Sequence, residues 1–143
     1  MADYFTNFSV VIPLEDATQQ QYALDLADKA AAACFRDEGE PAPADIPAEL
    51  LDVLEDWHFE TEKDGNHSIW LHSQNGGIDA VCAFIQHLLT RFNPEGRVEF
   101  EWSNDCSRPR VDAYGGGAAL VTAQEIKTMN TCEWLRQQAE SHV

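Results

Sequence analysis

The side chains best suited to chemistry are concentrated in one segment, E101-W-S-N-D-C-S-R-P-R-V-D-A-Y-G-G-G-A-A-L-V-T122. Cys106 lies there in a polar stretch that contains two arginines and follows an alternating, strand-like run. Nearby cations favour the thiolate form of a cysteine, which is the nucleophile in cysteine catalysis. The segment is therefore a candidate loop site. Its members are Asp105, Cys106, Arg108, Arg110 and Tyr114.

A catalytic role for Cys106 also needs a general base, and the spacing of the sequence links no histidine to this cysteine. The histidines available are His58, His67, His72 and His87. A cysteine at a strand end, beside Asp and Ser, is more typical of a turn. We therefore predict no catalytic residue, and an enzyme that uses Cys106 with an unidentified base is kept as an alternative.

The glycines of Y114-G-G-G117 raise the possibility of a phosphate-binding loop. Such loops follow a strand and open directly into a helix, whereas here the glycines run into the apolar stretch A118-A-L-V121. Glycine inside a strand marks either a bulge or a close approach of another backbone, and we favour the bulge. His67 and His72 are five residues apart and face opposite sides of a strand. We predict no cofactor and no metal site.

Hydrophobic periodicity predicts the elements that position these residues. The acid-rich segment before residue 58 contains a short amphipathic helix, and Thr122 with Glu125 matches the capping box of a last helix. The predicted strands cover residues 8–14, 58–62, 67–72, 97–102 and 116–122, and the predicted helices cover 18–35, 47–57, 78–92 and 123–139.

The order of these elements is typical of a split-βαβ, ferredoxin-like fold, an antiparallel sheet with two main helices on one face. We expect the first strand and residues 69–71 in the centre of the sheet, because they are the most apolar. The strands 58–62 and 97–102 are expected at its edges. Residues 1–143 form one α+β domain in this interpretation, with an acidic insertion at 37–57 and a strand–helix extension at 110–143.

The net charge of −16 is concentrated in the first half of the chain. The segment 37–64 holds 11 acidic residues against Lys63 alone. This distribution disfavours direct binding of nucleic acid and favours a protein partner with a basic surface. The predicted interaction residues are Asp37, Glu38, Glu40, Asp45, Glu49, Asp52, Glu55, Asp56, Glu60 and Glu62.

Alternation in the predicted strands places two pairs of glutamates on the sheet face that the helices leave open. Glu60 and Glu62 form one pair and Glu99 and Glu101 the other, and His58, Trp70 and His72 are expected on the same face. The alternative is that these acids lie on solvated edges, or that the last strand and helix cover the face.

The leading hypothesis is a non-enzymatic acidic protein-interaction module, of the kind found among small bacterial or phage accessory proteins. A sharper alternative is a nucleic-acid mimic that inhibits a basic DNA- or RNA-binding protein. No apolar run approaches the ~20 residues that span a bilayer, so we expect no membrane association and a cytoplasmic location. The identity of the partner and the oligomeric state do not follow from the sequence.

Overall fold

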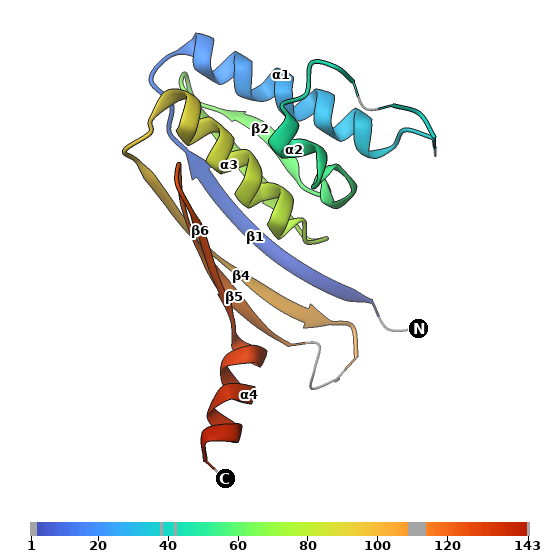
Figure 1. The fold of residues 1–143 in the computed structure, drawn as a ribbon, viewed down its shortest axis with the longest axis vertical. Coiled ribbons are helices and arrows are strands. Elements are labelled where there is room, and N and C mark those ends of the chain that lie inside the picture. Colours follow the sequence, from blue (N-terminus) through green and yellow to red (C-terminus); the bar gives the residue numbers. More distant parts are fainter. Residues whose placement is uncertain (1–2, 38, 42, 109–113, 143) are drawn as a thin grey trace.

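The computed structural model describes residues 3–37, 39–41, 43–108 and 114–142. It is an α+β fold with a six-stranded antiparallel sheet and four α-helices in the described part of the chain (Figure 1). None of these helices has the length and apolar character to cross a membrane. The elements are β1 (Tyr4–Ile12), α1 (Ala17–Cys34), α2 (Ala48–Leu51), the 3₁₀ turn η1 (Leu54–Asp56), β2 (Glu60–Asp64), β3 (Ser68–Ser73), α3 (Ile78–Phe92), β4 (Arg97–Cys106), β5 (Gly115–Thr122), β6 (Ile126–Asn130) and α4 (Thr131–Ser141).

The strands follow one another across the sheet in the order β2-β3-β1-β4-β5-β6. The apolar strands β1 and β3 are interior and β2 is an edge, as their sequences predict. The prediction of an edge position for residues 97–102 is wrong, because β5 and β6 continue the sheet beyond β4. Strand β4 also runs on to Cys106, and Asn104 pairs with Thr6 of β1. Asn104 and Asp105 are therefore strand residues, although the polar residues around Cys106 indicate a turn.

The predicted helix 123–139 begins too early. Thr122 and Glu125 close a hairpin turn instead of capping a helix: the Thr122 N–H donates to the Glu125 carbonyl at 2.9 Å. Residues 126–130 then form β6, and α4 starts at Thr131, where Asn130 accepts a hydrogen bond from the Glu133 N–H at 2.8 Å. The same Thr-x-x-Glu spacing serves a turn as well as a helix cap, because the threonine hydroxyl accepts a nearby backbone N–H in both.

The core lies between one face of the sheet and the helices, and α1 and α3 lie alongside each other over that face (Figure 1). Alanines of α1, including Ala23 and Ala30, are fully buried and permit a close approach to the sheet. The predicted helix 47–57 is broken into α2 and η1, but its inward side chains Leu50 and Leu54 are fully buried. The sheet side chains in this core are Phe8, Val10, Ile12, Ile69, Leu71, Val98, Phe100, Ala119 and Val121.

Candidate functional site

The second face of the sheet is left open by the helices that cover the first. In β1 and β3 the buried residues alternate with exposed ones, so that Val11 is 47% exposed and Trp70 is 36% exposed. The strand register places Val11 directly beside Trp70, and Ser9 beside His72. These four residues form a central strip on the open face. An exposed tryptophan on a sheet surface is a recurrent feature of binding sites.

Rows of carboxylates flank this strip on both sides. On the β2 side, Glu60 pairs with His72 and Glu62 pairs with Trp70 in the register of the sheet. On the β4 side the acids occupy alternate positions on the same face. We call this surface the acidic sheet face; it consists of the central strip and the six carboxylates Glu60, Glu62, Asp64, Glu99, Glu101 and Asp105.

Within the described residues, two bases border this surface, and both are paired with acids. Arg97 Nε lies 3.2 Å from Glu99 Oε1, and Lys127 Nζ lies 3.5 Å from Glu125 Oε1. Six carboxylates against two paired bases leave a negative surface, which attracts cations from solution. The alternation of acids along β2 and β4, read from the sequence, therefore matches their placement on one open face.

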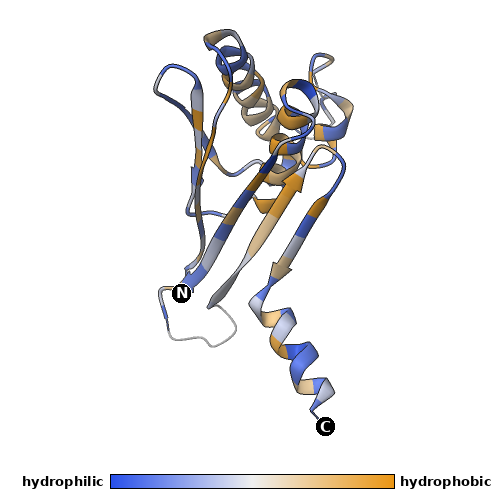
Figure 2. Ribbon diagram, turned by 90° about the vertical axis from the view of Figure 1, so that its left-hand side faces the viewer, coloured by the Kyte–Doolittle hydropathy of each residue, from blue (hydrophilic) through white to orange (hydrophobic). Residues whose placement is uncertain are grey.

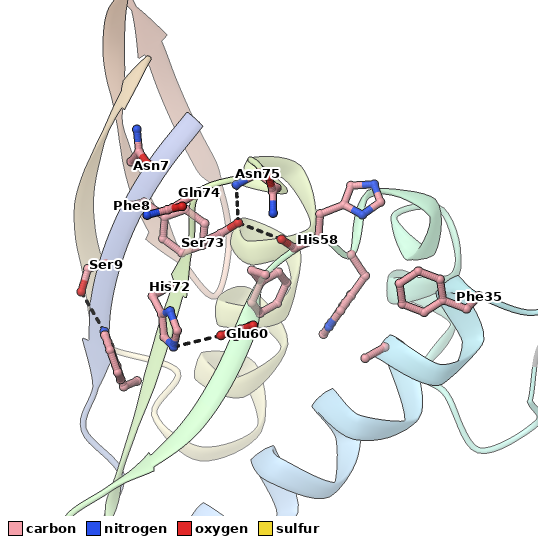
Figure 3. Close-up of a pocket in the computed structure, with 14 residues that line it drawn as sticks. Asn7, Phe8, Ser9, Phe35, His58, Glu60, His72, Ser73, Gln74 and Asn75 are labelled. Atoms are coloured by element: carbon pink, nitrogen blue, oxygen red, sulfur yellow. Dashed lines mark hydrogen bonds and ion pairs between the residues drawn. The ribbon is translucent and has the colours of Figure 1, made fainter. Parts of the chain in front are cut away.

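Close contacts fix the side chains at the centre of the acidic sheet face (Figure 3). His72 Nε2 donates to Glu62 Oε2 at 2.6 Å and lies 3.7 Å from Glu60 Oε2. The imidazole stacks on the Trp70 ring, with 3.8 Å between centroids and 24° between planes. Trp70 Nε1 in turn donates to Ser9 Oγ at 2.8 Å. The surface is thus ordered before any partner binds, which reduces the entropy lost on binding.

A groove of about 950 Å³ continues from this surface around the start of β2. Glu60, His72 and Ser9 line one part of it, and His58 and Phe35 lie across from them (Figure 3). His58 therefore lines the groove beside the open face, whereas strand alternation predicts it on the open face itself. Phe35, at the end of α1, is 80% exposed, so the groove has an apolar side chain across from its carboxylate.

Glu60, Glu62 and His72 also have the composition of a metal-ligand set. In the described part of the chain they are the one such group, with ligand atoms within 4.8 Å of one another. Imidazole and carboxylate together suit zinc and similar ions. The ion pair of His72 with Glu62 accounts for the same geometry without a metal. The group depends on the cross-strand pairing of β2 with β3, where Asp64 lies opposite Ser68 and the connecting loop is G65-N66-H67. The Asp-Gly pair in K63-D-G-N66 indicates a two-residue hairpin turn instead, which would give another register.

The other predicted interaction acids do not join this surface. Three of them, Asp45, Glu49 and Asp56, contact groups on the helical side. Asp45 Oδ2 lies 2.7 Å from Lys29 Nζ, and Asp56 Oδ2 accepts a hydrogen bond from the Ala80 N–H at 3.3 Å. The hydrogen bond between Asp45 and Lys29 lowers the pKa of Asp45 and raises that of Lys29. Asp37, Glu40, Asp52 and Glu55 are exposed there, and Glu38 lies outside the described residues.

Glu49, the third of these acids, belongs to a hydrogen-bonded chain that the sequence did not reveal. Its carboxylate accepts from His87 Nδ1 at 2.7 Å, and His87 Nε2 lies 2.8 Å from the Tyr22 hydroxyl. A hydrogen bond from its own backbone, followed by the one from His87, lowers the pKa of Glu49. The chain joins α2, α3 and α1, which gives it a structural role in holding the short helix α2 in place.

Four residues of the predicted loop site, Asp105, Cys106, Arg108 and Tyr114, lie in the described part of the chain, around the end of β4 and the start of β5. Cys106 ends β4 and is 9% exposed, and its carbonyl accepts a hydrogen bond from the Tyr114 hydroxyl at 3.0 Å. Among the described residues no hydrogen bond joins the Cys106 thiol to a histidine. The Arg108 carbonyl accepts from the same hydroxyl at 3.3 Å. Arg110 lies outside the described residues.

The glycines after Tyr114 do not form the predicted bulge, since β4 and β5 pair without interruption from Arg97 and Thr122 to Asn104 and Gly115. The close approach of neighbouring groups accounts for them. A Cβ atom on Gly116 would collide with the Trp102 carbonyl oxygen, and one on Gly117 would collide with the Trp102 ring. Gly116 and Gly117 therefore admit β5 beside Trp102, whereas a Cβ atom on Gly115 would meet the Thr131 hydroxyl. The three glycines open into a strand and not into a phosphate-binding helix.

Alkylation of the native protein with iodoacetamide is expected to label Cys132 fastest, because it is exposed, and Cys34 next. Cys82 and Cys106 are buried and should react only after unfolding. Burial also raises the pKa of Cys82 to about 12, so this side chain remains a protonated, unreactive thiol at neutral pH. Peptide mass spectrometry over a time course measures this order. Labelling of Cys106 as fast as Cys132 would contradict this order and would favour the hypothesis of an enzyme that uses Cys106.

Comparison of the chain with protein-family models, with curated proteins and with solved structures gives no match. The geometry of the acidic sheet face and of its groove is therefore the basis for a functional proposal.

Proposed function

We propose that this chain is a non-enzymatic protein-interaction module whose acidic sheet face binds a basic segment of a partner protein. One observation carries the proposal: the exposed, fixed Trp70 lies between rows of carboxylates on a face that the helices leave open. A lysine or arginine side chain laid across Trp70 gains a cation–π contact of roughly 0.5–1 kcal/mol at an exposed site. Its charged end then reaches Glu62 on one side or the β4 acids on the other.

The proposed partner segment is extended and carries basic residues with a few apolar ones. The groove beside Glu60 supports this, because Phe35 adds an apolar contact at its far side. The nucleic-acid mimic is a narrower version of the same proposal. It is supported by the alternate spacing of Glu60, Glu62 and Asp64, whose carboxylates recur about every 6.6 Å along an extended strand. DNA or RNA would then compete with this chain for the partner.

We further infer that β1, α1, β2, β3, α3 and β4 form a ferredoxin-like split-βαβ unit. The antiparallel order β2-β3-β1-β4, with one main helix following β1 and another following β3, supports this inference. The segment 37–57 is then an insertion after α1, and β5, β6 and α4 belong to the extension. In such a unit both helices use the same sheet face, which leaves the opposite face free for binding.

Nuclear magnetic resonance with two synthetic peptides tests the proposed site. The first alternates arginine with leucine, and the second has the same length with glutamate in place of arginine. We expect only the basic peptide to shift amide signals, in β2, β3 and β4 and at the indole N–H of Trp70. Shifts confined to residues 39–56, or equal shifts with both peptides, would overturn the proposal.

A further inference from the structure

The end of the chain forms an arm that contributes nothing to the core. We define the C-terminal arm as β6 and α4, residues 126–141. No residue of α4 is buried, and its Trp134 and Leu135 are 52% and 60% exposed. In β6, Ile126 and Met129 are 40% and 45% exposed. Figures 1 and 2 show α4 extending away from the rest of the molecule. An 11-residue helix with no packed face is marginally stable in water.

The arm is nevertheless held firmly in this position. β6 pairs with β5 from Ile126 to Asn130, and the Gly116 N–H donates to Thr131 Oγ1 at 3.0 Å where the helix begins. Asn130 and Glu133 exchange hydrogen bonds of 2.8 and 3.2 Å in a capping arrangement. These contacts fix the direction of α4 relative to the sheet. The exposed apolar side chains of α4 therefore have a defined position on the surface.

The two edges of the sheet differ in a way that bears on what binds the arm. The edge strand β2 carries four charged residues in five, Glu60, Glu62, Lys63 and Asp64, and such charges discourage the pairing of edges. The edge strand β6 reads I-K-T-M-N and carries only Lys127. Its outer backbone groups are therefore open to a further strand, without the protection that β2 has.

The distribution of charge selects a second copy of this chain as the occupant. In residues 126–143 two acids and two bases cancel, so the whole net charge of −16 belongs to residues 1–125. Two copies repel each other at every strongly acidic surface and approach most easily through this neutral arm. A basic partner is drawn to the acidic surfaces instead, and the arm offers it no attraction of charge.

We propose that two copies associate through their C-terminal arms, with β6 pairing antiparallel to β6 of the second copy across a two-fold axis. Antiparallel pairing is compatible with such an axis, because each contact of one copy is repeated by the other. In this arrangement α4 begins at the end of β6 that lies beside Ile126 of the second copy. Trp134 and Leu135 then cover apolar surface there, and the two sheets become continuous.

Sedimentation velocity of the full chain over a concentration series tests the proposal. We expect the wild type to sediment at twice its monomer mass of 16.0 kDa. Two double variants, Trp134→Glu/Leu135→Glu in α4 and Ile126→Glu/Met129→Glu in β6, should sediment as monomers. All four side chains are exposed in a single copy, so the variants should keep the far-ultraviolet circular dichroism spectrum of the wild type, and their unfolding midpoint should fall only by the stabilisation that association adds.

The matched control is Phe35→Glu/Leu51→Glu, which adds the same charge and removes an exposed aromatic and an exposed aliphatic residue elsewhere. It should remain a dimer. A monomeric wild type, a dimeric α4 or β6 variant, or a monomeric control would each overturn the proposal. Salt separates this proposal from the proposed function: screening of the −16 charge should strengthen self-association, whereas it should weaken binding of the arginine peptide. Either can therefore fail without the other.

Discussion

Replacement of Phe84 by alanine is expected to lower the free energy of unfolding by about 3–5 kcal/mol. Phe84 is fully buried in α3, and its ring lies 5.3 Å from that of Trp57 and 6.1 Å from that of Phe59. The cavity left by the missing ring would loosen both neighbours. Because Phe59 directly precedes Glu60, the cavity should also loosen the start of β2 and the acidic sheet face.

Urea denaturation followed by circular dichroism measures this change. Phe35→Ala serves as the control, since that ring is 80% exposed and its removal should change stability by no more than about 0.5 kcal/mol. If Phe84→Ala cost less than about 1 kcal/mol, the aromatic cluster of Trp57, Phe59 and Phe84 would not be part of a close-packed core.

Elements that bury one face were predicted well from the sequence. The stripe of α3 faces the core, and its periodicity reports that burial directly. The apolar run of β1 faces the core only in part, because Phe8, Val10 and Ile12 are buried whereas Val11 lies on the open face. The C-terminal arm was mispredicted for the same reason. It buries no side chain, so its sequence carries no periodicity set by packing, and the Thr122 to Glu125 pattern was open to two interpretations.

The candidate site was predictable where it depends on alternation along a strand. Glu60, Glu62, Glu99 and Glu101 lie on one face because residues two apart in a strand point the same way. The contact of His72 with Glu62 depends on the register between two strands, which alternation alone does not supply. The acidic block 37–64 divides between the helical side and the sheet face, because nearness in the sequence does not determine on which side of the sheet a residue lies.

Neutralisation of the acidic sheet face should have the largest effect on binding. The variant Glu60→Gln/Glu62→Gln/Glu99→Gln/Glu101→Gln removes four charges and leaves shape almost unchanged. Exposed ion pairs contribute about 0.2–1 kcal/mol each, so four of them sum to about 0.8–4 kcal/mol, which corresponds to a loss of affinity for the arginine peptide between roughly 4-fold and several hundred-fold at low salt. The matched control Asp37→Asn/Glu40→Gln/Asp52→Asn/Glu55→Gln removes the same charge from exposed positions on the helical side.

The binding site on the acidic sheet face is tested most directly by the affinity of the wild type, the sheet-face variant and the helical-side variant for the arginine peptide, measured by fluorescence anisotropy across a series of salt concentrations. We expect the wild type and the helical-side variant to bind tightly at low salt and to lose affinity steeply as salt is added. The sheet-face variant should bind weakly throughout, with little dependence on salt. Equal losses in the two variants would show that net charge alone attracts the peptide, and would contradict a binding site on the acidic sheet face.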